Sequence, residues 1–136
     1  MGNAFITRRG AGAARATYEN YKASEAGITP ATATDLSQER SELAATTVGN
    51  YALFGGGGQG SSSHRSITDA YDKHLLRSTV TSLNTSRSSL AATTVGNYAL
   101  FGGGQSGGNI YSATVDVYDN NLVKTTATDL SQGRGY

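Results

Sequence analysis

Short runs that alternate apolar and small polar residues, separated by glycine, serine and asparagine, make up most of the chain after residue 42. Each run has four to six residues, which suits a β-strand and is too short for a helix with a packed face. The runs LAATTV and YALF are joined by Gly49-Asn50, and glycine readily adopts the positive φ of a hairpin turn. We therefore expect an all-β protein built from antiparallel strands.

The whole pattern repeats every 47 residues. The segment LAATTVGNYALFGGG occupies 43–57 and again 90–104, and TATDLSQ occupies 32–38 and 126–132. A period of this length, with short apolar runs and glycine, indicates propeller blades or other stacked units, which cannot bury their faces alone. The sequence thus divides into a leader or extra strand at 1–16, a partial unit at 17–42, and full units at 43–89 and 90–136.

Each full unit is expected to fold as a four-stranded antiparallel sheet. Beyond the hairpin, the third run is 67–71 in the first unit and 114–118 in the second, and the fourth run is 78–83 or 125–130. The fourth run is rich in threonine and serine, which suits an edge strand that faces solvent.

The YALF run is apolar on both of its sides. Side chains alternate across a strand, so Tyr51 and Leu53 point to one side while Ala52 and Phe54 point to the other. This pattern predicts that the strand is sandwiched between neighbouring sheets.

These features together resemble the kelch repeat of β-propellers. The family pattern is a strand that ends in a double glycine, then a tyrosine, then an arginine before the next unit. The matching residues are Gly55, Gly56, Gly102 and Gly103, Tyr71 and Tyr118, and Arg40, Arg87 and Arg134. The chain departs from the pattern at the tryptophan that usually follows the tyrosine, because it contains none. The resemblance covers 32–136 and extends to kelch-like repeat proteins of bacteria and their phages.

The resemblance implies kelch-like β-propeller blades, each a four-stranded antiparallel sheet, with about 2.5–3 blades per chain. An open stack would leave two apolar faces in water, so we expect identical chains to close the propeller. If residues 3–29 complete the partial blade, a homodimer would have six blades. The alternative is that residues 1–16 are a leader.

Composition excludes several classes of protein. With 11 Lys and Arg, 10 Asp and Glu and a net charge of +1, the chain lacks the concentrated basic surface of a nucleic-acid binder. It has no cysteine and no apolar run long enough to span a membrane. The first ten residues, MGNAFITRRG, have no apolar stretch, so we expect no signal peptide and a soluble protein. The localisation stays open, and the resemblance to phage proteins leaves a virion-associated role possible.

We expect no catalytic residues, no metal site and no cofactor. Both GGGxxG stretches fit a dinucleotide fingerprint, but strand-like sequence rather than a helix follows them. His64 lies beside three serines on one loop, which does not provide the fixed geometry of a serine hydrolase. Arg40, Arg87 and Arg134 recur too regularly for a single site, and we expect them to form charge-paired links between units.

The two full units differ most in their inter-strand loops, at 58–68 and 105–112, and loops on a rigid scaffold usually carry recognition. We therefore predict a non-catalytic module that binds another protein or a surface glycan. The candidate ligand-binding residues are Gln59, Ser62, His64, Arg65, Gln105, Asn109 and Tyr111. The alternatives are a sugar isomerase- or oxidase-like propeller enzyme and a truncated repeat without a specific ligand.

Overall fold

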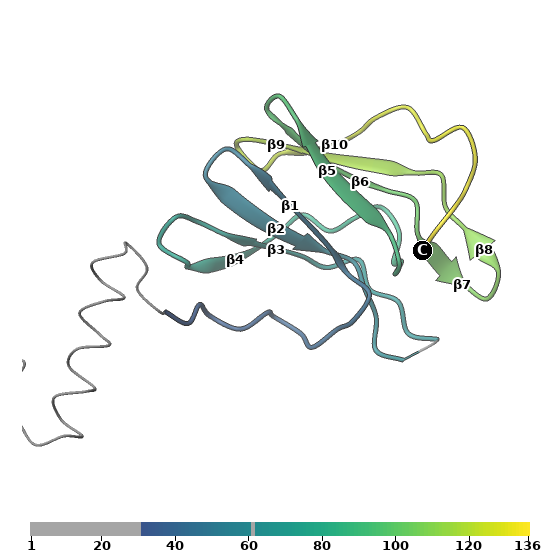
Figure 1. Ribbon diagram of the computed structural model, residues 1–136, viewed down its shortest axis with the longest axis horizontal. Coiled ribbons are helices and arrows are strands. Elements are labelled where there is room, and N and C mark those ends of the chain that lie inside the picture. Colours follow the sequence, from purple (N-terminus) through teal and green to yellow (C-terminus); the bar gives the residue numbers. More distant parts are fainter. Residues whose placement is uncertain (1–30, 61) are drawn as a thin grey trace, which may run out of the picture. The chain divides into compact units, whose positions relative to one another are not determined.

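The computed structural model describes residues 31–60 and 62–136, of which 33–136 form one compact unit. Every regular element among the described residues is a β-strand, so the all-β prediction is confirmed (Figure 1). The predicted segment 1–16 and the first part of the partial unit lie outside the described residues. The strands are β1 (Ala44–Val48), β2 (Tyr51–Gly55), β3 (Thr68–Tyr71), β4 (Arg77–Val80), β5 (Ala91–Val95), β6 (Tyr98–Gly102), β7 (Gln105–Gly107), β8 (Ile110–Tyr111), β9 (Val115–Asp119) and β10 (Lys124–Thr126).

The first sheet contains β1 to β4 in chain order, and all its neighbours are antiparallel, as predicted. Its first hairpin turns at Gly49-Asn50, where the register pairs Val48 with Tyr51. Gly49 has a φ of 55°, in the left-handed region that a side chain makes costly. The local sequence therefore sets both the turn and the register of this hairpin.

The second sheet repeats this order with β5, β6, β9 and β10. Between β6 and β9 the chain forms the small β7–β8 hairpin, where the sequence predicted only a loop. Gly107 and Gly108 both have positive φ, which lets the chain reverse tightly after β7. The hairpin is thus a local addition to a repeated sheet.

The fourth strand of the first sheet ends earlier than the predicted run at 78–83. β4 stops at Val80, and the following residues cross to the second sheet. There the carbonyl of Thr81 accepts a hydrogen bond from the Tyr118 hydroxyl at 2.5 Å, and Leu83 is buried. The Leu83 amide still donates to the Ser66 carbonyl at 2.8 Å, so this segment contacts both sheets.

The two copies of the repeated segment have the same sequence but different burial. Val48 of β1 is 1% exposed, whereas its counterpart Val95 of β5 is 61% exposed. Phe101 is fully buried, and its counterpart Phe54 is only partly buried. One face of the first sheet packs against one face of the second, and the opposite face of the second sheet has no such cover among the described residues.

The contact between the sheets is close because a glycine faces an aromatic ring. A Cβ atom placed on Gly55 would lie 2.9 Å from Cε1 of Phe101, closer than real Cβ atoms approach. The Phe101 ring also packs edge-on against Tyr118, with centroids 5.8 Å apart. Gly55 therefore forms a socket, here called the glycine socket, that accepts the phenylalanine of the next sheet.

The hairpins of the two sheets also lie side by side, with β1 next to β5 (Figure 1). The hydroxyl oxygens of Thr46 and Thr94 are 2.7 Å apart, and Thr94 also donates to the Thr47 carbonyl. The first hairpin of each unit thus meets its counterpart in the next, 47 residues further along the chain.

Replacing Phe101 with alanine is expected to lower the free energy of unfolding by about 3–5 kcal/mol, because it empties a filled socket. The matched variant Phe54→Ala removes the same side chain from a partly exposed site, so we expect about half that loss or less. Urea denaturation of both variants measures the difference. Equal losses would contradict the unequal burial of the two repeats.

Candidate binding site

The two variable loops leave the same end of the molecule, after the glycines that close β2 and β6. At this end Gly57 has a φ of 95° and its amide donates to the Arg87 carbonyl at 2.9 Å. Its counterpart Gly104 has a φ of 100° and donates to the Arg134 carbonyl at 2.7 Å. Equivalent backbone contacts therefore fix the start of each loop.

The loop of the first sheet holds four of the predicted ligand-binding residues. Gln59 and Ser62 are exposed, and the Arg65 guanidinium lies 3.5 Å from Oε1 of Gln59. His64 is half-buried and pairs with Gly58 in an isolated β-bridge. The chain therefore folds back on itself here, as it does in the β7–β8 hairpin.

The β7–β8 hairpin carries the other three predicted residues. Gln105 begins β7 and its side-chain amide donates to the Gly108 carbonyl. Asn109 is exposed at the turn, and Tyr111 ends β8 with 39% of its surface exposed. Tyr111 stands 47 residues after His64, so these two predicted residues occupy the same position in successive units.

Ser88 joins the two loops and was missed by the sequence analysis. Its hydroxyl lies 3.1 Å from Nδ1 of His64, and its backbone exchanges hydrogen bonds of 3.0 and 2.7 Å with Gln105. No motif pointed to Ser88, but its place just after the recurring Arg87 is a signal that could have found it. The structure thus brings His64 and Gln105 to one continuous edge.

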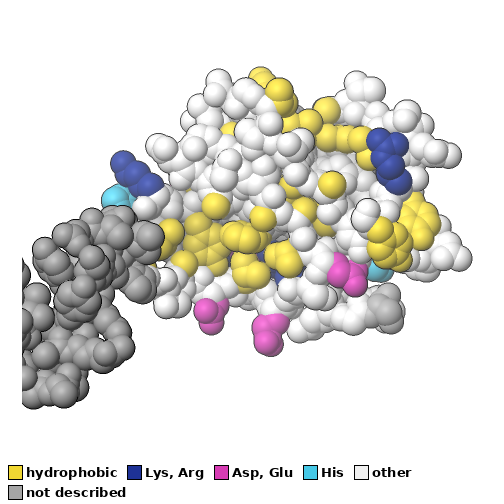
Figure 2. Space-filling view, in the orientation of Figure 1, with side chains coloured by type: hydrophobic (Ala, Val, Ile, Leu, Met, Phe, Trp, Pro, Cys, Tyr) yellow, Lys and Arg dark blue, Asp and Glu magenta, His cyan; other side chains and the backbone are white. Residues whose placement is uncertain are grey.

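Tyr136 is a second residue that sequence reasoning did not select. Its ring lies 6.2 Å from the ring of Tyr111 at a 60° tilt, and its hydroxyl is 3.3 Å from Oε1 of Gln105. The neighbouring Tyr111 raises the pKa of Tyr136 above the ordinary tyrosine value. Figure 2 shows hydrophobic side chains gathered at the end of the molecule where β7 and β8 lie.

The two tyrosines border a recess of about 270 Å³ that also contacts Gly133, Arg134 and Gly135. We call Gln105, Tyr111 and Tyr136 with this recess the tyrosine site. It combines two exposed aromatic faces with phenol and amide groups. Such a set can pack against an apolar surface while exchanging hydrogen bonds with hydroxyl or amide groups.

Two of the recurring arginines, Arg40 and Arg87, and the tyrosines of the repeat lie between successive units rather than in the loops, whereas Arg134, expected to form the same charge-paired link, has no ion pair with the described residues. Arg87, fully buried, donates to the Asp116 carboxylate at 2.8 Å and to the Phe101 carbonyl at 3.0 Å. Arg40 makes the same two contacts one unit earlier, to Asp69 at 3.1 Å and to the Phe54 carbonyl at 3.0 Å.

The tyrosines behave in the same way. Tyr118 donates to the Thr81 carbonyl, and Tyr71 donates to the Thr34 carbonyl at 2.6 Å. Burial raises the pKa of Tyr118 to about 12. The segment 33–40 is thus held against the first sheet by the hydrogen bonds of Thr34, Ser37 and Arg40.

Asp69 belongs to this link and not to a catalytic relay with His64. Its carboxylate accepts hydrogen bonds from Ser37, Arg40 and Thr79. Burial alone would raise the pKa of Asp69, but these hydrogen bonds and the arginine charge outweigh it and hold the pKa below the ordinary value.

Within the described ranges no three histidine or acidic side chains are grouped as metal ligands, and no helix there could cross a membrane. Comparison of the chain with models of known protein families gives no match. Comparison with curated proteins also gives none. The kelch resemblance therefore rests on the residues of this chain alone and stays a prediction.

Replacing Arg87 with alanine is expected to cost about 3–5 kcal/mol of stability, because Asp116 would stay buried without its partner. Arg134 has no ion pair among the described residues, and Arg134→Ala should change stability by no more than about 0.5 kcal/mol. Chemical denaturation of both variants gives the comparison. A mild effect at Arg87 would contradict the buried link.

The lowered pKa of Asp69 predicts that the protein loses stability in acid. Its pKa is lower in the folded chain than in the unfolded one, so its contribution is complete above the unfolded value and disappears as pH falls below about 4. Unfolding free energies measured between neutral pH and strong acid should therefore decline in that window. Ser37→Ala removes the hydrogen bond from the Ser37 hydroxyl to Asp69, keeps the one from the backbone amide, and should make the decline smaller; an unchanged slope would contradict this assignment.

Proposed function

We propose that residues 33–136 are kelch-like β-propeller blades that carry a non-catalytic site for a glycan or protein ligand. The propeller is supported by the two antiparallel four-stranded sheets, which have the same strand arrangement and stack on one another. Further support comes from residues 47 apart at the edge of the stack. The Ser89 amide donates to the Glu42 carbonyl at 2.8 Å, and the Tyr136 amide donates to the Ser89 carbonyl at 3.0 Å.

Glu42, Ser89 and Tyr136 also share a positive φ, of 57°, 55° and 78°. A backbone conformation and a hydrogen bond that recur once per unit are what stacking around a common axis requires. The uncovered face of the second sheet supports self-association of the chain; a six-bladed homodimer is the expected form only if residues 3–29 complete a third blade.

The tyrosine site is the observation that carries the binding proposal. It is a part of the described surface where two exposed aromatic rings border a recess and one of their hydroxyls lies 3.3 Å from the side-chain oxygen of Gln105. Two of its residues, Gln105 and Tyr111, lie on a loop that differs between units, whereas the hairpins behind the loops are identical. A glycan suits this set because its apolar ring faces pack on aromatic side chains while its hydroxyls bond to amide and phenol groups.

Tyr111→Ala is expected to abolish binding to a glycan array with no change in melting temperature, because the ring is exposed and outside the core. Binding of the intact chain to the same array is the reference measurement. Val123→Ala, which truncates an exposed apolar residue in the β9–β10 turn at the other end of the sheet, is the matched control and should bind normally. Retained binding by Tyr111→Ala, or an array without a bound glycan, would count against the glycan site.

A further inference from the structure

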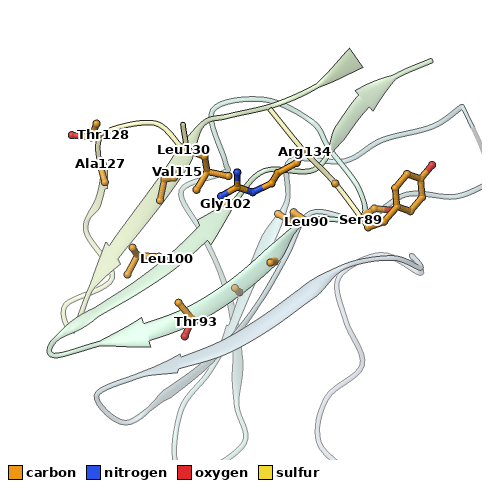
Figure 3. Close-up of a pocket in the computed structure, with 14 residues that line it drawn as sticks. Ser89, Leu90, Thr93, Leu100, Gly102, Val115, Ala127, Thr128, Leu130 and Arg134 are labelled. Atoms are coloured by element: carbon orange, nitrogen blue, oxygen red, sulfur yellow. The ribbon is translucent and has the colours of Figure 1, made fainter. Parts of the chain in front are cut away.

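The outer face of the second sheet contains an apolar groove of about 490 Å³ (Figure 3). Gly102 and Leu100 of β6 form part of its floor, Val115 and Leu130 lie beside them, and Arg134 reaches over the groove. Arg134 is exposed and its guanidinium makes no hydrogen bond with the described residues. We call this region the outer groove.

The outer groove is the counterpart, one unit later, of a site that is already filled. Gly102 stands 47 residues after Gly55, which faces the Phe101 ring at 2.9 Å. At Gly102 the nearest side-chain atoms to an added Cβ are at 3.6 Å or more, and no ring occupies the socket. The repeat therefore defines what fits here: a phenylalanine on the face of another sheet.

The first sheet of the same chain presents that phenylalanine. Phe54 packs edge-on against Tyr71 with centroids 5.8 Å apart and planes at 86°, the geometry of the Phe101–Tyr118 pair. Phe54 is only partly buried, and its carbonyl accepts a hydrogen bond from Arg40 of the segment 33–40. The chain thus carries an empty socket on one face and a matching ring on the other.

We infer that the outer groove binds the first sheet of a second copy of this chain, with Phe54 of that copy in the socket at Gly102. The inference rests on the proposed stacking of blades and names the surface through which it continues. Because the socket and the ring lie on opposite faces of the chain, the contact is head-to-tail, and it closes into a ring or extends as a filament.

In this docking, the segment 126–134 of one copy competes with the segment 33–40 of the other for the same face of the first sheet. The sequence TATDLSQ-x-Arg occurs at 32–40, where Arg40 holds Asp69, and again at 126–134. Inside the chain, the first unit contacts the second sheet through Arg87 and Asp116. If the second unit contacts the first sheet of another copy in the same way, Arg134 reaches Asp69 of that copy, which Arg40 of that copy otherwise holds. The segment 126–134 then replaces 33–40 with nearly the same contacts, and the buried Phe54 ring is the net gain.

Sedimentation velocity of the full chain over a range of concentrations tests the inference, and we expect association to two or more copies. Gly102→Val fills the socket, and its Cβ meets only ordinary contacts within the chain. We expect this variant to keep the melting temperature of the monomer and to associate at least about tenfold more weakly. Phe54→Ala, which removes the ring from the other face, should have the same effect on association.

Alanine substitutions of Arg134 and Arg40 should change association in opposite directions. Arg134→Ala should weaken association, whereas Arg40→Ala frees Asp69 for the incoming Arg134 and should strengthen it, measured at a temperature where this less stable variant remains folded. Lys73→Ala, which removes an exposed cation from the β3–β4 turn, is the charge-matched control and should leave association unchanged. If Arg40→Ala and Arg134→Ala both weaken association, the exchange of segments is wrong.

The remaining outcomes separate this inference from the proposed function. Association that persists unchanged in Gly102→Val overturns the outer groove as the docking surface and leaves self-association standing. A chain that stays monomeric at all concentrations overturns both, while glycan binding through Tyr111 is measured separately. Weaker association in Gly102→Val with an unchanged melting temperature, together with weaker association in Phe54→Ala measured well below its own melting temperature, supports head-to-tail docking.

Discussion

A sheet that is apolar on both faces is stable only when both faces are covered, and this constraint governs the protein. The hairpin of each unit has the same fifteen residues, so it presents the same two faces wherever it occurs. Inside the chain one such face meets the other, and Leu53, Ala99 and Phe101 become fully buried. Close packing is possible because the ring of one sheet lies on the glycine of the next.

The buried guanidinium gives this stacking its direction. Arg87 leaves the end of one unit and reaches both the carboxylate of Asp116 and a backbone carbonyl of the next. A buried ion pair of this kind contributes modestly to stability but is costly when one partner is missing. It therefore penalises any other register between sheets more than an apolar contact alone would, since a shift of the sheets would leave two charges unpaired.

Much of the fold could be predicted from the sequence because its signals are local. The Gly49-Asn50 turn and the alternation in YALF predicted the hairpin, and the period predicted that the sheet occurs twice. The end of β4 could not be predicted, because it depends on the contact of Thr81 with Tyr118, which is 37 residues further along the chain. Asp69 and Asp116, the ion-pair partners of Arg40 and Arg87, could likewise not be predicted, because no sequence motif specifies the acidic partner of an arginine in another unit.

The candidate site was predicted in part, for a reason that the repeat explains. Tyr111 was selected because it lies in a variable loop, and the structure shows it at the unit position that His64 occupies in the first loop. Ser88 and Tyr136, the residues that contact these two, belong to the repeated linker, where sequence comparison between units suggested only structure. Each loop is therefore supported by the linker that ends the same unit, so changing one loop residue alters the surface without disturbing the stack. A scaffold in which the packing positions are fixed and one supported position varies is suited to presenting a series of different side chains along one edge.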